Sequence, residues 1–192
     1  KYMRIAGIDY SMSSPAICTH IGNKWHYNNC KFYYLTSVKK LATNFCEGKR
    51  WYQSQNRFHG TLQPKKHKND EERFDNISHW AMKHCLKFDF VAIEGYAFGA
   101  TGRVFQVAEN TSILKHKLWE TDTPFGVYSP STIKKFATGK GNATKEDMYD
   151  AWLKETGVDL KEIMIPNREK VGNPVTDIVD SYFICKYYYF LP

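Results

Sequence analysis

Four acidic residues occupy positions from which their carboxylates could act together. Asp9 and Glu94 each end a short apolar segment, while Asp177 and Asp180 are three residues apart near the end of the chain. That spacing places both aspartates on one face of a helix. A single acid at the end of a strand is commonly only a turn residue. A functional site is therefore expected only if the four side chains converge.

Four carboxylates held close together favour one kind of chemistry. Like charges at short range raise one another's pKa values unless cations neutralise them. Hard oxygen ligands favour Mg²⁺ or Mn²⁺, and two such ions roughly 3.5–4 Å apart can activate water and stabilise the leaving oxygen of a phosphodiester. The sequence thus predicts a hydrolytic metal site built from Asp9, Glu94, Asp177 and Asp180.

The elements that would position these acids can be inferred from apolar patterning. Residues 3–9 and 89–94 are apolar runs typical of buried strands. If these strands are adjacent and parallel, their carboxyl ends meet at one edge of the sheet, so Asp9 and Glu94 become neighbours. Pro174 suits the first turn of a last helix, whose dipole favours the two aspartates near its start.

The remaining pattern predicts an α/β domain. Antiparallel strands over residues 16–21, 25–30 and 32–35 follow the first strand, and residues 125–128 form a fifth short strand. Amphipathic helices are predicted over residues 71–87, 104–118 and 133–137, with another capped by Thr144 and Asp147. The second of these helices could serve packing, dimerisation or both.

Composition limits the class of protein and its partners. The 192 residues predict one domain, 1–192, and a formal net charge of +7 favours a polyanionic partner, although an anionic membrane surface would suit the same charge. Five cysteines without a C-x-x-C pair predict reduced core thiols of a cytoplasmic protein, because their spacing matches no zinc finger. No apolar run approaches membrane-spanning length, and no secretory leader pattern opens the sequence.

A basic insertion at about residues 37–72 interrupts the apolar pattern. Its lysines and arginines are interleaved with Trp51, Tyr52 and Phe58. Such a mixture suits contacts to phosphates and unstacked bases. The alternative is a solvated, irregular insertion without a ligand.

The order of the four acids, together with residues 133–145 (IKKFATGKGNATK), resembles the RuvC family of Holliday junction resolvases. The resemblance implies a ribonuclease H-like fold: a five-stranded mixed sheet, with strands 1–3 antiparallel and strands 4–5 parallel to strand 1, flanked by α-helices. It also implies a homodimer that makes paired nicks in a four-way DNA junction during recombination or repair. Two Mg²⁺ ions per site, replaceable by Mn²⁺, would be bound by the four acids.

Further residue roles follow from the same resemblance. Lys134 and Lys145 match family lysines that contact the scissile backbone or support the charge developing on it, although helix-end lysines are often only solvated. The expected substrate-binding residues are Tyr96, Phe98, Arg103 and Lys140. Tyr96 and Phe98 bracket the place of the family's junction-probing aromatic residue, but could equally be ordinary loop packing.

The match covers most of the chain except residues 37–72, and it has departures. Family members commonly have Pro-Gly after the first aspartate, where this chain has Tyr10 and Ser11. The divergence suggests a phage-encoded or similarly distant member, which would act in the host cytoplasm.

Three other functions are compatible with parts of the pattern. A nuclease of the same fold could act more broadly on flaps, branched forks or RNA–DNA hybrids. A catalytically silent junction-binding module would have no need for four clustered acids. An actin-like ATPase also begins with an acid-ended strand, but the glycine-rich phosphate loops of that class are missing from this sequence.

Overall fold

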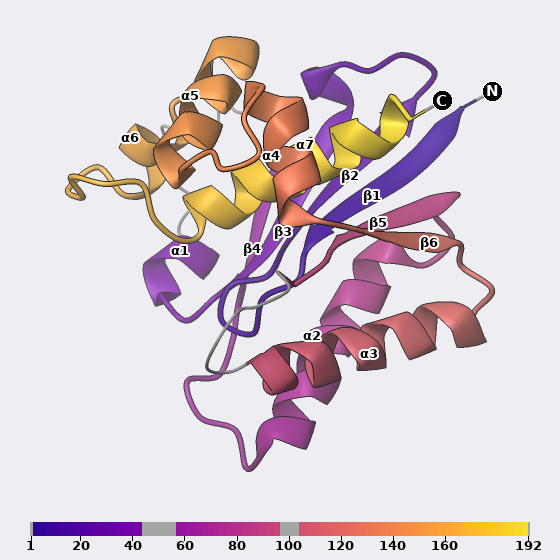
Figure 1. Ribbon diagram of the computed structural model, residues 1–192. Helices are drawn as coiled ribbons and strands as arrows, with labels where there is room; N and C mark the ends of the chain where they lie inside the picture. Colours follow the sequence, from indigo (N-terminus) through magenta and orange to yellow (C-terminus); the bar gives the residue numbers. More distant parts are fainter. Residues whose placement is uncertain (1, 44–56, 97–103, 192) are drawn as a thin grey trace.

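A six-stranded mixed sheet forms the centre of the molecule, with helices on both faces (Figure 1). The computed structural model describes residues 2–43, 57–96 and 104–191. The sheet has the order β4-β3-β2-β1-β5-β6. The strands are β1 (Met3–Asp9), β2 (Ala16–Gly22), β3 (Cys30–Thr36), β4 (Phe58–Leu62), β5 (Phe90–Glu94) and β6 (Phe125–Tyr128). The helices are α1 (Lys39–Thr43), α2 (Asp70–Cys85), α3 (Val104–Glu120), α4 (Pro130–Thr138), α5 (Lys145–Thr156), α6 (Leu160–Met164) and α7 (Val175–Tyr189).

Strand β1 is central and organises both sides of the sheet. It pairs antiparallel with β2, where Asp9 faces Ala16, and parallel with β5, where Ile8 faces Ile93. Side chains alternate along a strand, so Ile5 enters the core beneath α7 while Ile8 enters the core beneath α2 and α3. The same alternation puts Asp9 on the α7 side.

The predicted mixed sheet is confirmed, with one more strand than expected. The first three strands are antiparallel, and β5 and β6 run parallel to β1. The additional strand, β4, comes from the basic insertion and pairs parallel with β3. Phe58 fixes it there by stacking on Phe32, with ring centroids 5.0 Å apart. The insertion therefore extends the sheet, which corrects the expected count of five strands.

The expected strand over residues 25–30 is also wrong in part. Residues 27–29 form a 3-10 turn, and β3 is continuous from Cys30 to Thr36. His26 caps the turn by accepting a hydrogen bond from the Asn28 amide at 3.0 Å. Trp25 is taken out of the sheet because it stacks on His20, with ring centroids 4.6 Å apart.

Helix α7 lies directly across β1, and a glycine makes this approach possible. A Cβ atom at Gly7 would lie 2.3 Å from the Cys185 amide nitrogen, closer than any real contact. The Cys185 thiol contacts the Ile5 carbonyl oxygen at 3.6 Å. The first turns of α7 are thereby carried toward the end of β1, where Asp9 lies (Figure 1).

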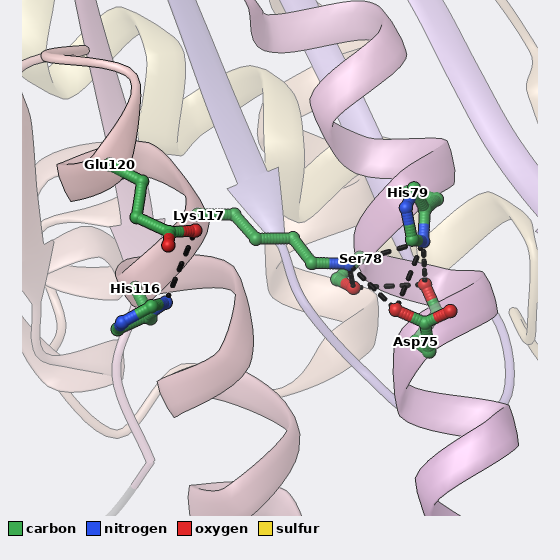
Figure 2. A network of polar contacts seen from close by, with 6 residues as sticks. All are labelled: Asp75, Ser78, His79, His116, Lys117 and Glu120. Atoms are coloured by element: carbon green, nitrogen blue, oxygen red, sulfur yellow. Dashed lines mark hydrogen bonds and ion pairs between the residues drawn. The ribbon is translucent and has the colours of Figure 1, made fainter.

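Helices α2 and α3 cover the opposite face and are joined by polar contacts (Figure 2). Lys117 on α3 reaches α2, where its Nζ donates to Asp75 Oδ1 and to Ser78 Oγ, both at 2.8 Å. The contact with Lys117 is the main reason that the pKa of the Asp75 carboxyl is lowered. Among the described residues, no helix is long and apolar enough to cross a membrane.

Candidate active site

The four acids predicted from the sequence meet at one edge of the sheet. Asp9 ends β1 and Glu94 ends β5, one position beyond the parallel pair Ile8 and Ile93. Asp177 and Asp180 come from the first half of α7 and act electrostatically on Asp9, as does Glu94. Convergence of these carboxyls follows from two features, parallel pairing of β1 with β5 and the crossing of α7 over β1.

Burial and mutual repulsion raise the pKa of every carboxyl in this group. The pKa of Asp9 is raised well above its ordinary value, first by burial and then by the charges of the other three acids. Burial, followed by the charge of Asp180, raises the pKa of Glu94 to about 8. Burial and the charge of Asp177 raise the pKa of Asp180 to about 7. The site therefore holds more negative charge than it can keep without protons or cations.

Asp177 differs from the others because hydrogen bonds favour its charged form. Burial raises its pKa to about 6, but a bond from Ser14 and another from Asp9 act in the opposite direction. The bond between the two carboxyls raises the pKa of Asp9 and lowers that of Asp177. Asp177 is therefore the acid of this group whose charged form the hydroxyl of Ser14 supports.

Two lysines lie beside the carboxyls, as their positions in the sequence suggested. The charge of Lys134 lowers the pKa values of Glu94 and Asp180, and that of Lys145 lowers those of Asp177 and Asp180. Lys145 is the first residue of α5, which begins there because Thr144 and Asp147 form the predicted capping box. The lysines and two of the acids, Glu94 and Asp180, line a small cavity of about 170 Å³.

A second cavity opens on the other side of Glu94. Its volume is about 460 Å³, and its lining includes Asp9, Glu94, Tyr96, Arg73 and the loop after β1. Glu94 therefore lines both cavities, whereas Asp9 lines only the larger one. Tyr96 is 46% exposed at the mouth of this second cavity.

A hydrogen-bonded chain that sequence reasoning missed fixes Asp177. The Ser14 hydroxyl donates to Asp177 Oδ2 at 2.7 Å and accepts from Asn173 Nδ2 at 2.6 Å. Thr176 Oγ1 in turn donates to the Asn173 side-chain oxygen at 2.8 Å. The only signal in the sequence was the small, polar composition of the loop after Asp9.

The loop after β1 is held from its other side by residues that were not expected. Arg73 on α2 donates to the Met12 carbonyl oxygen through Nε at 3.1 Å and Nη2 at 2.7 Å. Gln63, just beyond β4, donates to the same oxygen at 3.3 Å. The insertion and the acid-bearing loop are therefore joined at one carbonyl group.

The remaining predicted site residues have different outcomes. Phe98 and Arg103 lie outside the described residues. Lys140 is exposed beyond the end of α4, lines neither cavity, and acts on Asp147 instead of the four acids. Its expected substrate contact stays a prediction.

The donor set fits a hard divalent cation. Within residues 2–43, 57–96 and 104–191, no three His, Cys, Asp or Glu side chains form a ready-made metal-binding group. Asp177 is buried and the other three acids are half-buried. Their four carboxyls, whose pKa values are all raised, nevertheless offer the all-oxygen donors that Mg²⁺ and Mn²⁺ prefer.

The sheet order and the helix crossing define a class: this is the ribonuclease H-like fold of the Holliday junction resolvases. Thermus thermophilus RuvC is similar at a TM-score of 0.60 and 16% identity, over 97% of this chain and 95% of that chain. The same protein in complex with a Holliday junction substrate matches at a TM-score of 0.60 and 14% identity, over 97% of this chain and 94% of that chain.

A viral enzyme shares the fold more loosely. The Fowlpox virus resolvase, in complex with Holliday junction DNA, matches at a TM-score of 0.51 and 16% identity, over 97% of this chain and 96% of that chain. No protein-family model matches the chain. The resemblance drawn from the acids is thus confirmed at the level of the fold.

Proposed function

We propose that this protein is a structure-specific DNA endonuclease that resolves four-way junctions by paired, Mg²⁺-dependent hydrolysis of phosphodiesters. The observation that carries the proposal is the convergence of four acids, one buried and three half-buried, and two lysines at the carboxyl edge of β1 and β5. A fold shared with junction resolvases over 97% of the chain supports the choice of substrate.

Each residue has a distinct task in the proposed reaction. Asp9, Glu94, Asp177 and Asp180 would hold the divalent ions, which when bound supply activation of water and stabilisation of the leaving oxygen. Lys134 and Lys145 oppose the negative charge of the acids and would oppose that of the scissile phosphate. Ser14 keeps Asp177 in its charged form.

Paired cleavage also implies an assembly. A four-way junction presents two equivalent strands, so two nicks in one complex require two active sites, and a two-fold dimer supplies them. We therefore include a homodimer in the proposal, which sedimentation of the protein alone and with a junction can test.

The direct test is cleavage of a synthetic four-way junction in Mg²⁺ by wild type, Asp9→Asn and Glu94→Gln. Each substitution removes one carboxylate charge while keeping the shape of the side chain, so we expect at least a hundredfold loss of rate. Asp122→Asn is a matched control, because Asp122 lies in the turn before β6, at the opposite end of the sheet. Wild-type rates in either active-site variant would refute the assignment.

Substrate choice requires a second comparison. Flap, linear duplex and RNA–DNA hybrid substrates are cut in parallel with the junction. Preference for the junction supports resolution, whereas equal rates on all four would favour a broader nuclease. Junction binding without cleavage in Mg²⁺ or Mn²⁺ would favour a silent binding module.

A further inference from the structure

A second groove lies directly beside the active-site cavity and is built largely from the basic insertion. Its volume is about 560 Å³, and its lining includes Gln63, Lys65 and His67 of the insertion together with Ser13 and Arg73. Ser13 and Arg73 also line the cavity that contains Asp9 and Glu94. The two hollows therefore share a wall, and a strand leaving the acids on this side would enter the groove.

The side chains of this insertion groove suit an anionic ligand with hydrogen-bond acceptors. Lys65 lines the groove and Lys66 follows it in the chain, and both side chains are exposed. His67 Nε2 is shielded from solvent and lacks a hydrogen-bond partner among the residues that the structure describes. A phosphate oxygen or a base edge would provide that partner.

Nearby acids do not cancel this character. Glu72 does not line the groove, and its carboxylate accepts a hydrogen bond from the Lys68 backbone amide at 2.5 Å. Glu71 lines a different hollow, between α2 and α3. Asp70 alone among the acids lines the insertion groove.

The groove is also held in fixed register with the active site. Gln63 is buried, and its backbone amide donates to the Thr36 carbonyl oxygen at 2.8 Å. This bond continues the pairing of β4 with β3. Its side chain, together with Arg73, donates to Met12 in the loop after β1. A ligand in the groove would therefore meet a surface whose position relative to Asp9 is set by hydrogen bonds.

We propose that the insertion groove binds the sugar–phosphate backbone of the DNA strand next to the scissile phosphate. This inference rests on the proposed nuclease function and extends it to a part of the chain that the family resemblance does not cover. Its ligand class is a continuous nucleic-acid strand, because the groove adjoins the cavity of the reacting centre and shares Ser13 and Arg73 with it.

The test is the salt dependence of junction binding in EDTA, where cleavage cannot occur. Lys65→Gln with Lys66→Gln removes one charge from the groove lining and one from the residue that follows it in the chain. The control is Lys24→Gln with Lys83→Gln, which removes two exposed charges outside the groove. Lys24 follows the end of β2, and Lys83 lies in the last turn of α2. Both double variants have the same net charge, so only position differs between them.

We expect the slope of log Kd against log salt to fall by about one to two in the groove variant, since each lost phosphate contact releases about one counterion fewer. The control variant should retain a slope close to that of wild type. Equal slopes in the two variants, or no change in either, would overturn the groove assignment while leaving wild-type junction cleavage intact. Failure of wild type to bind or cut a junction would instead refute the proposed function, and the groove proposal with it.

Discussion

At the scale of single residues, the hydroxyl group of Ser14 favours the charged form of one acid of the active site, Asp177. Ser14 and Asp177 are 163 positions apart in the chain, yet their side-chain oxygens lie 2.7 Å apart. A donor bonded to a carboxylate favours its charged form, and the pKa of Asp177 is lower than burial alone would make it. Ser14 is thus a positioning residue, which acts on the reaction through Asp177.

Replacing Ser14 by alanine should therefore change the pH dependence of cleavage. Without the hydroxyl the pKa of Asp177 rises. The charged carboxylate that the reaction requires is then protonated at a higher pH than in wild type. Because a hydrogen bond to a charged group is worth about 1.5–3 kcal/mol, we expect the step that Asp177 contributes to the acidic limb of the rate profile to move upward by about one pH unit. The steps of Asp180 and Glu94, whose pKa values are higher, should stay in place. Junction cleavage at several pH values measures this shift.

The conservative variant Ser14→Thr is the control, because it keeps the hydroxyl and should retain the position of the acidic limb. A uniform loss of rate in Ser14→Ala at all pH values would mean that the residue has only a structural role.

At the scale of elements, the crossing of α7 over β1 decides whether the acids meet. Gly7 and Cys185 lie at this crossing, about two turns along α7 from Asp177 and about one and a half from Asp180. The backbone of α7, which cannot rotate away as a side chain can, occupies the space of any added Cβ atom. The helix must move if Gly7 is replaced.

Gly7→Ala should accordingly lower both stability and activity. Overpacking of a close contact costs about 1–3 kcal/mol, and displacement of α7 would also move Asp177 and Asp180 away from Asp9. Denaturant unfolding measures the first effect and junction cleavage the second. Gly141→Ala is the control, since an added Cβ there would lie 3.4 Å from the Ser131 carbonyl oxygen, an ordinary contact. Equal stability of the two variants would contradict the role assigned to Gly7.

Some elements were predictable from the sequence and others were not, for physical reasons. Met3–Asp9 and Phe125–Tyr128 have the predicted bounds because short runs rich in apolar and aromatic residues specify strands, although only the first of the two is buried. Strand β4 has no such pattern, because Thr61 and Leu62 at its end are exposed. Its position in the sheet depends on the stacking of Phe58 on Phe32. The local sequence around Phe58 does not indicate that it stacks on Phe32, which lies 26 residues earlier.

The same distinction applies within the site. The acids were predictable because strand ends and a three-residue helical spacing are local features. The contacts of Ser14 with Asn173 and of Arg73 with Met12 depend on the folded chain alone. Sequence reasoning therefore found the acids and lysines of the site and missed the side chains that hold them and the adjoining loop in place.

At the scale of the whole molecule, the clustered acids couple stability to pH and to divalent cations. Carboxyls of the unfolded chain lose their protons near pH 4, whereas burial and repulsion keep the folded pKa values of Asp177, Asp180 and Glu94 at about 6, 7 and 8. The folded state binds more protons over this interval. The free energy of unfolding must therefore decrease as pH rises through it.

Between pH 5.5 and 8.5 in EDTA, we expect the free energy of unfolding of wild type to fall by at least about 1 kcal/mol relative to that of the variant Asp180→Asn. The Tm of the two proteins at each pH measures this difference. The variant serves as reference because it retains His84, whose pKa burial lowers to about 4 and which acts in the opposite direction. Excess Mg²⁺ should restore wild type at pH 8.5 and have little effect on it at pH 5.5. A wild-type Tm that rises with pH relative to the variant would contradict the site electrostatics.

The packing of Cys185 against Gly7 also provides a means of observing motion of the active site. Cys18, Cys30, Cys85 and Cys185 are free and buried, and burial raises the pKa of the Cys185 thiol, so that it is protected from alkylation in the folded state. Modification of this one sulfur requires α7 to separate from β1, which is the same separation that would carry two acids away from the other two. The alkylation rate of the Cys185 peptide, followed by mass spectrometry with and without junction DNA, would therefore report how often the catalytic group comes apart in solution.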